Sequence, residues 1–262
     1  MNALAPLIEL SDVAITHFDA AETVLIRQVN WSIGRGDFWV VGGRSSSGKS
    51  SLLLTAAGLN RPAGGSMRIF GKDLAEAKEK DQVSWRHRIG FVFEYGGRAF
   101  NHLTVAENIA LPLRYHSAAG EEQIQAKVDE VLARAHLRTH AQHFPSLLSL
   151  AVQQRVALGR ALSTTATLEE LPEVLFLDNP LSTLSLRECR WWLDFLRQLR
   201  ESPASGGNHV TIVASADDFR GWSEVADQFA VLENDRFRIV GGREQLTADQ
   251  EPIIQELLGT GI

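Results

Sequence analysis

The sequence predicts an α/β protein with a parallel sheet at its core and a helical insertion near residues 100–160. Two short apolar runs, Val174–Leu177 and Val210–Val213, are typical of strands buried on both faces of a sheet. The stretch Leu186–Leu199 between them is long enough for the crossover helix that parallel strands require. A third apolar run, Phe38–Val41, precedes a Gly/Ser-rich loop and a short helix, and this alternation of strand and helix is typical of an α/β fold.

The remaining elements follow from periodicity. Alternation of apolar and polar residues predicts strands, whereas an apolar stripe at helical spacing predicts a helix. The expected elements are strands over Leu7–Ile15 and Val24–Ile33, a helix over Leu52–Gly58, short strands and turns over 60–93, a helix over Glu121–Leu137, and a hairpin of Phe229–Leu232 with Phe237–Val240.

Composition narrows the possible functions. The chain has 262 residues, of which 44% are hydrophobic, so it has enough apolar surface to fold. The 26 Lys and Arg against 32 Asp and Glu give a net charge of −6, which argues against a nucleic-acid partner. The start of the chain has neither a basic segment nor a long apolar one, and no stretch reaches the roughly 20 apolar residues of a membrane helix. We therefore expect a cytoplasmic protein that reaches a membrane only through a partner.

A glycine-rich segment carries the clearest chemistry. Residues 43–50, Gly-Arg-Ser-Ser-Ser-Gly-Lys-Ser, fit the pattern G-x-x-x-x-G-K-[ST] between a predicted strand and a predicted helix. Backbone N–H groups of such a loop bind phosphate oxygens, Lys49 reaches the terminal phosphates, and the Ser50 hydroxyl binds Mg²⁺. An ordinary Ser/Gly loop is the alternative, and the strand–loop–helix context disfavours it. The candidate nucleotide-binding residues are Gly43, Arg44, Ser45, Ser46, Ser47, Gly48, Lys49, Ser50 and Ser51.

An acidic residue completes the predicted metal site. Asp178 directly follows the apolar run Val174–Leu177, so it lies at the carboxyl end of a predicted core strand. In proteins with this type of phosphate loop, that position holds Mg²⁺ or its water shell. A nucleoside triphosphate with Mg²⁺ is thus the expected ligand, and the resemblance described next implies that it is ATP.

Three further segments resemble one family. They are Phe91–Glu94, Asn101–Leu113 and Gln153–Leu162. With them, the chain resembles the nucleotide-binding subunit of an ABC transporter over nearly its whole length. The resemblance implies a P-loop NTPase (RecA-like) ABC ATPase core, at 1–94 and 160–262, with an N-terminal antiparallel β-subdomain and an inserted α-helical subdomain at 95–159.

The same resemblance implies partners. Members of the family form dimers that enclose two ATP molecules and dock under membrane permease subunits on the cytoplasmic face of the inner membrane. The permease would meet Phe100–Leu113. Residues 93–113 and the tail 250–258 further resemble the Mla-type ATPases that power phospholipid transport by MCE-protein systems.

Several family positions carry other residues here. The glutamate that polarises the attacking water aligns with Asn179, and an amide cannot act as a carboxylate base. The histidine that contacts the terminal phosphate aligns with Ala216, and the glutamine that joins the Mg²⁺ shell aligns with Glu94, which still offers a metal ligand. The resemblance therefore predicts weak or absent hydrolysis.

The residues that would serve a partner subunit are altered too. The signature L-S-G-G-Q aligns with residues 148–152, where Ser149 is kept but Leu150 and Ala151 replace glycines. An acidic residue of the dimer-facing loop aligns with Ser185. The aromatic residue that stacks on adenine aligns with either His17 or Phe18.

Three functions remain open at this point. The first is the degenerate, ATP-binding half of a transporter's nucleotide-binding pair. The second is an active homodimeric ATPase in which Glu94 replaces the missing base. The third is a protein outside transport that uses its ATP-bound fold as a scaffold.

Overall fold

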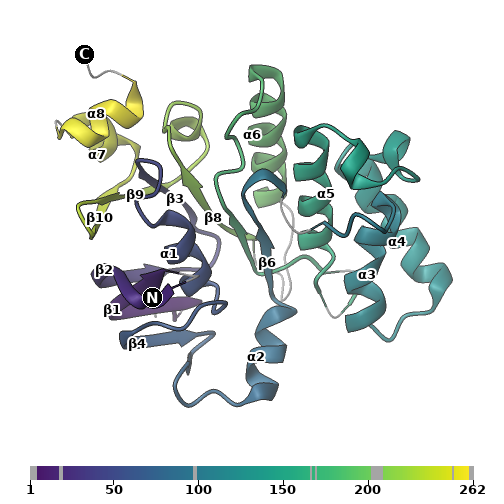
Figure 1. The fold of residues 1–262 in the computed structure, drawn as a ribbon, viewed down its shortest axis with the longest axis horizontal. Coiled ribbons are helices and arrows are strands. Elements are labelled where there is room, and N and C mark those ends of the chain that lie inside the picture. Colours follow the sequence, from purple (N-terminus) through teal and green to yellow (C-terminus); the bar gives the residue numbers. More distant parts are fainter. Residues whose placement is uncertain are drawn as a thin grey trace.

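The chain folds around one continuous mixed β-sheet with helices packed against it (Figure 1). The computed structural model describes residues 5–17, 20–96, 99–165, 167–168, 170–201, 209–249 and 251–259. Within these residues the sheet has ten strands in the order β5-β4-β1-β2-β10-β9-β3-β8-β7-β6. The strands are β1 Ile8–His17, β2 Ala20–Ile33, β3 Phe38–Gly43, β4 Gly64–Ile69, β5 Lys72–Asp73, β6 Ile89–Val92, β7 Val174–Leu177, β8 Thr211–Ala216, β9 Gln228–Glu233 and β10 Arg236–Gly241. The helices are α1 Lys49–Ala56, α2 Glu79–Arg86, α3 Val105–His116, α4 Glu121–Arg134, α5 Leu150–Leu162, α6 Leu186–Glu201, α7 Arg243–Ala248 and α8 Pro252–Leu258.

The parallel half of the sheet confirms the predicted core. Strands β6, β7, β8, β3 and β9 pair in parallel, with Leu175 of β7 opposite Ile212 of β8 and Ile212 opposite Phe38 of β3. All residues of β3, β7 and β8 are buried, because helices and the second half of the sheet cover both faces. The α/β fold class predicted from the apolar runs is therefore correct.

Alternate residues of the parallel strands enter two separate apolar cores. On one face, Phe38, Leu175 and Ile212 pack with residues of α5, α6 and α8. On the other face, Trp39 and Phe176 pack with residues of α1 and of the antiparallel strands β1, β2 and β4. This two-sided packing places the carboxyl ends of β3, β7 and β8 at one edge of the sheet, where the phosphate loop lies.

Helices α3, α4 and α5 share a third core. Its buried residues include Val105, Ile109 and Val128, and Figure 1 shows these helices grouped beside the β6 edge of the sheet. The buried Asn108 side chain ties the preceding loop to α3: its amide donates to the carbonyls of Phe100, Leu103 and Thr104, and its oxygen accepts from the Phe100 N–H at 2.8 Å. Thr104 and Glu107 then cap the helix reciprocally.

Two element predictions need correction. Residues 60–93 were expected to form strands and turns only, but Glu79–Arg86 forms α2. This helix buries only Trp85, so the sequence has no apolar stripe, and its start is fixed by the Asp81 carboxylate accepting the Lys78 N–H at 3.1 Å. The helix expected over Leu52–Gly58 begins earlier, at Lys49, because the phosphate loop leads directly into it.

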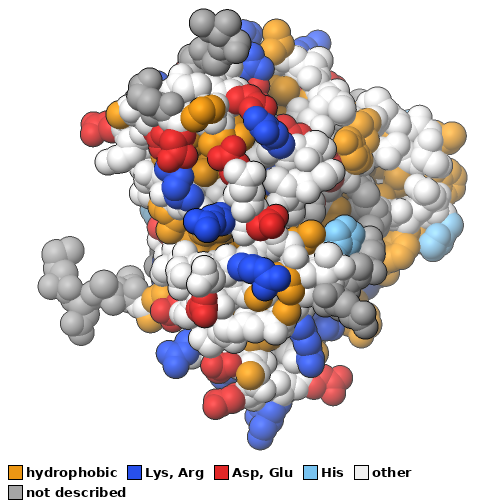
Figure 2. All heavy atoms as spheres, turned by 60° about the vertical axis from the view of Figure 1, so that its left-hand side comes forward, with side chains coloured by type: hydrophobic (Ala, Val, Ile, Leu, Met, Phe, Trp, Pro, Cys, Tyr) orange, Lys and Arg blue, Asp and Glu red, His pale blue; other side chains and the backbone are white. Residues whose placement is uncertain are grey.

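No helix in the described part of the chain combines the length and the apolar character needed to cross a membrane. On the face shown in Figure 2, basic and acidic side chains are interspersed. Exposed charges of the described residues also form ion pairs between segments distant in the sequence, such as Arg44 with Glu256.

A buried carboxylate links the segments that precede β3, β6 and β7, and it yields a stability prediction. Glu173 accepts from Arg88 Nε at 2.6 Å and from Arg35 Nη1 at 2.8 Å, and its side chain is 9% exposed. Burial raises the pKa of Glu173, but the hydrogen bonds and charges of Arg88 and Arg35 outweigh it, so the pKa lies below its usual value. Glu173→Gln should lower the free energy of unfolding by about 2 kcal/mol in urea denaturation at pH 7.

A depressed carboxyl pKa stabilises the fold above the unfolded-state pKa, and this contribution is lost as the pH falls through the folded-state value. The difference between wild type and Glu173→Gln should therefore shrink below about pH 4.5, the ordinary value for this group. The matched control is Glu256→Gln, which removes the exposed pair with Arg44 and should cost much less, because water and salt screen an exposed ion pair. Equal costs for the two variants would contradict the assigned role of Glu173.

Candidate nucleotide-binding site

The predicted phosphate loop wraps tightly between β3 and α1. Gly48 has φ 99°, a backbone conformation that side chains disfavour. A Cβ atom at Gly43 would lie 2.7 Å from both the Leu232 carbonyl oxygen and the Ser47 Oγ, so only glycine fits there. The two glycines of the motif are thus required by the geometry of the loop.

Lys49 lies across this loop and is almost fully buried. Its Nζ donates to the carbonyl oxygens of Gly43 at 2.6 Å and Arg44 at 2.8 Å. The third partner is Asp217 Oδ1, also at 2.8 Å, contributed by the segment after β8. Asp217 was not among the residues singled out from the sequence, although an acid one residue beyond a core strand was a usable signal.

The predicted metal-binding residues converge on the same cavity. Ser50, Asp178 and Glu94 line a cavity of about 190 Å³ together with the phosphate loop. The buried Asp178 carboxylate accepts from Ser215 Oγ at 2.7 Å and is hydrogen-bonded to Ser50. Burial raises the pKa of Asp178, and the charge of Glu94 adds to this, whereas the hydrogen bonds from Ser215 and Ser50 and the charge of Lys49 oppose it. A divalent cation would favour the ionised form of Asp178 and reduce the repulsion between the two carboxylates.

The residues present fit a magnesium-bound triphosphate. Two carboxylates and a hydroxyl supply the oxygen ligands that Mg²⁺ prefers. The Ser47 hydroxyl is buried in the loop and has no hydrogen-bond partner among the described residues, but Ser47 is not among the residues that line the cavity. Bound there, Mg²⁺ would neutralise phosphate charge beside Asp178 and Ser50.

Asn179 lies between two carboxylates. It follows Asp178 with φ 46°, and its backbone N–H donates to Ser215 Oγ at 2.9 Å. Its side-chain Nδ2 is 2.9 Å from Glu94 Oε1 and 2.9 Å from Asp217 Oδ2, so both of its N–H bonds are used. Asn179 therefore connects Glu94 to Asp217 and carries no basic group.

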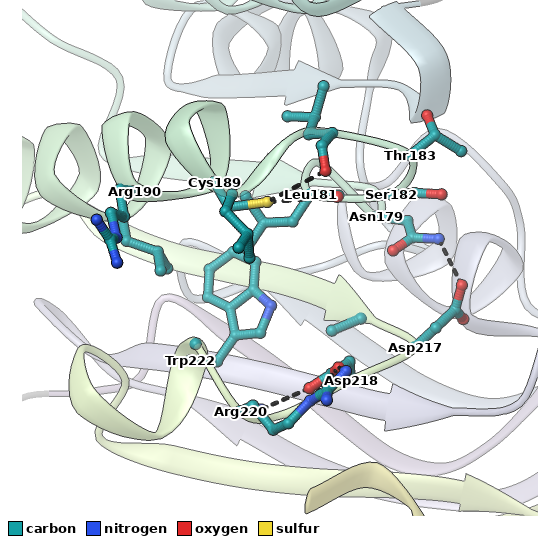
Figure 3. A pocket seen from close by; sticks show the side chains of 15 residues that line it. Asn179, Leu181, Ser182, Thr183, Cys189, Arg190, Asp217, Asp218, Arg220 and Trp222 are labelled. Carbon is teal, nitrogen blue, oxygen red and sulfur yellow. Dashed lines mark hydrogen bonds and ion pairs between the residues drawn. The ribbon is translucent and has the colours of Figure 1, made fainter. Parts of the chain in front are cut away.

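Ala216 ends β8 opposite Gly42 and is 2% exposed. It presents a methyl group at a position where the resemblance expects a histidine, so no side-chain donor is available there. A larger cavity of about 660 Å³ opens beside it (Figure 3). Asn179 and Asp217 line both this cavity and the phosphate-loop cavity, and Figure 3 shows the hydrogen bond that joins them.

The base-binding candidates are only partly described. His17, at the end of β1, lines the phosphate-loop cavity, together with Leu25 of β2, which the sequence did not suggest. Phe18 lies outside the described residues. The placement of His17 therefore keeps it as a candidate for stacking on a base.

The altered signature segment does not line this cavity. Ser149 is exposed and is the N-cap residue of α5, and Leu150 begins the helix. The described residues that form the cavity come instead from β1, β2, the phosphate loop, α1 and the segments after β6, β7 and β8. Any role of Ser149 and Leu150 would therefore concern a site other than this one.

The fold and the site together define a P-loop nucleotide-binding protein: a glycine-rich loop joins a buried parallel strand to a helix, and an acid ends a neighbouring strand. Residues 26–182 match a family model described as "ABC transporter". The chain therefore belongs to the ABC transporter family, as the sequence resemblance predicted, and it is an ATP-binding cassette with Mg²⁺ as the usual companion ion.

Curated relatives agree with this assignment. The chain is 34% identical over 256 residues to the sulfate/thiosulfate import ATP-binding protein CysA of Mycolicibacterium paratuberculosis, covering 95% of this chain and 65% of the relative. It is 32% identical to a methionine import ATP-binding protein of Paraburkholderia xenovorans, covering 88% of this chain and 57% of the relative. The chain thus spans about three fifths of the length of such relatives.

Solved structures also match. The ATP-binding cassette MJ0796, in a dimeric post-hydrolysis state with ADP and Pi, gives a TM-score of 0.76 at 27% identity and covers 90% of this chain and 99% of its own. CbiO1 from Clostridium perfringens, part of the cbiONQ complex, gives 0.76 at 21% identity, covering 95% of this chain and 93% of its own. Both support the ABC ATPase fold.

Proposed function

We propose that this chain is the ATP-binding subunit of an ABC transporter that holds MgATP and hydrolyses it slowly or not at all. The observation that carries the proposal is the contrast within one cavity. Lys49, Ser50 and Asp178 line this cavity, and this supports their proposed roles toward the triphosphate and the metal. Beside them, Asn179 supplies an amide whose two N–H bonds are already used.

The site lacks two groups that would accelerate hydrolysis, a general base and a donor to the terminal phosphate. Attack of water on the terminal phosphate is accelerated by a positioned base, and such a base contributes about 10²–10⁴ in rate. Asn179 cannot accept that proton, and the Ala216 methyl cannot donate to the departing phosphate. Removing a hydrogen-bond donor to the terminal phosphate lowers the rate by about another factor of 10²–10³, and the two effects on the rate need not add.

The proposal extends to a second subunit, identical or paralogous. In such a pair, the α5 N-terminus of one chain serves the nucleotide of the other. The Leu150 and Ala151 side chains would hinder the close backbone approach that glycines permit. This chain would therefore present a poor signature to the partner's nucleotide as well as lack a base of its own.

The remaining partner would be a membrane permease on the cytoplasmic face of the inner membrane. Exposed apolar side chains near the start and end of α3, among them Phe100, Leu111 and Tyr115, support docking at Phe100–Leu113. The relatives' names favour an importer. The Mla-type resemblance of residues 93–113 instead predicts a phospholipid cargo, while Gln250, at the start of the resembling tail, lies outside the described residues.

The packing of the helices supports the proposed division of the chain. The shared apolar core of α3, α4 and α5 supports treating 95–159 as an inserted lobe.

Recovery of the tagged chain from membranes in a mild detergent tests this role. We expect a multi-spanning permease, identified by mass spectrometry, to co-purify with the chain in a fixed ratio. The variant Phe100→Asp with Leu111→Asp should lose the permease while still binding ATP. Recovery of a folded, ATP-binding chain without any permease would contradict transport and favour the scaffold role.

The active-ATPase alternative has one favourable observation, the placement of Glu94 in the same cavity. It requires turnover at ordinary enzyme rates, and it requires that Glu94→Gln abolish this turnover.

A further inference from the structure

The Asp217 carboxylate is held at both of its oxygen atoms by donors of the phosphate site. Lys49 Nζ contacts Oδ1 at 2.8 Å, and Asn179 Nδ2 contacts Oδ2 at 2.9 Å. One cation and one amide thus bind two oxygens of a single anion. This two-point arrangement also suits two oxygens of a phosphoryl group, which lie at a similar spacing.

Lys49 has no N–H bond to spare in this arrangement. Its three ammonium protons match three acceptors, the carbonyls of Gly43 and Arg44 and the Asp217 carboxylate. The carbonyls belong to the loop backbone and are fixed. A terminal phosphate that binds Lys49 must therefore displace Asp217, which is the one acceptor carried on a side chain.

We propose that Asp217 occupies the place of the terminal phosphate of ATP and is exchanged for it on binding. The inference rests on the proposed nucleotide site and assigns two residues within it. Asp217 competes for Lys49 when no terminal phosphate is present. Once Asp217 withdraws, Asn179 has an N–H free to donate to that phosphate, while its other N–H remains on Glu94. Asn179 thereby favours a triphosphate over a diphosphate, whereas Asp217 weakens the binding of a triphosphate by competing with it for Lys49.

The fold leaves room for the displaced carboxylate. The Asp217 side chain is 45% exposed and also lines the 660 Å³ cavity. Arg190 and Arg220 line the same cavity (Figure 3). Arg220 is paired with Asp218, which also lines it, so Arg190 is the basic side chain that we expect to favour a carboxylate that turns toward this cavity. Repulsion between a bound phosphate and Asp217 would favour this movement.

Calorimetric titration of the purified full chain with ATP and with ADP, both with Mg²⁺, tests the exchange. Asp217→Ala should tighten ATP binding about tenfold, the scale of one charge-assisted hydrogen bond, and change ADP binding less than about twofold. Asp217→Asn, which keeps the shape but not the charge, should be intermediate. Asp218→Ala is the matched control: it removes the adjacent acid, which pairs with Arg220 instead of Lys49, and should leave both affinities unchanged.

The role of Asn179 is tested by measuring nucleotide affinity in the Asp217→Ala variant. There, Asn179→Ala should weaken ATP binding about five- to tenfold and leave ADP binding unchanged, because only ATP offers an oxygen to the freed N–H. Unchanged or weaker ATP binding by both Asp217 variants would overturn the inference, as would equal effects on ATP and ADP. If wild type itself binds no nucleotide, the proposed function fails; if wild type binds and these variants behave like Asp218→Ala, only the exchange fails.

Discussion

Lys49→Ala is expected to weaken MgATP binding at least about a hundredfold. Lys49 is the lysine of the phosphate loop, and its nearly complete burial keeps its charge poorly screened beside the bound phosphates. Loss of one charge-assisted hydrogen bond, together with loss of the positive charge beside the triphosphate, accounts for about 3 kcal/mol, which corresponds to the hundredfold change. Calorimetric titration with ATP and Mg²⁺ measures it directly.

The fold should survive this change. The Lys49 side chain contacts loop carbonyls and Asp217 and is not part of an apolar core. The matched control is Lys72→Ala, which removes the same charge from an exposed lysine paired with Asp81 at the other end of the sheet. It should bind ATP like wild type. Equal affinity of wild type and Lys49→Ala, in chains with unchanged circular dichroism, would place the nucleotide elsewhere.

Asn179→Glu alone is expected to raise turnover by less than about tenfold, although it restores the carboxylate of the family. The structure gives a reason: Glu94 Oε1 and Asp217 Oδ2 each lie 2.9 Å from Asn179 Nδ2. A glutamate there would exchange two hydrogen bonds for two repulsive contacts, and such contacts raise carboxyl pKa values. The base would be protonated or displaced, and Ala216 and Leu150 would remain unchanged.

A combined variant tests which of these substitutions limit the rate of hydrolysis. Asn179→Glu with Glu94→Gln and Ala216→His removes one repulsive neighbour and restores the donor, and it should exceed Asn179→Glu alone by about tenfold or more in phosphate release. The larger cavity beside Ala216 leaves space for the imidazole. Vigorous hydrolysis by Asn179→Glu alone would show that the other substitutions do not limit the rate.

The sequence predicted those features that depend on short stretches of chain. The apolar runs that became β3 and β7 are buried on both faces because each must pack against two layers, and this leaves a local signal. The phosphate loop is likewise local, since its glycines, Lys49 and Ser50 are adjacent in the chain. Helix α2 was missed because its one buried side chain, Trp85, gives no periodic pattern.

The sequence could not predict how distant residues meet. Asp217 and Lys49 are 168 positions apart, and Glu94 and Asn179 are 85 apart, so their contacts depend on the order of β3, β8, β7 and β6 in the sheet. The resemblance identified Asn179 as an altered position. Only the structure shows that its amide is held between two carboxylates, and that Asp217 belongs to the site.

The most direct test of the account is phosphate release by the isolated wild-type chain at saturating MgATP, with Lys49→Ala as the blank for contaminating ATPases. We predict stoichiometric ATP binding and release slower than about 0.01 s⁻¹, two or more orders of magnitude below ordinary enzyme rates. Release at about 1 s⁻¹ or faster, lost in Lys49→Ala, would contradict the account.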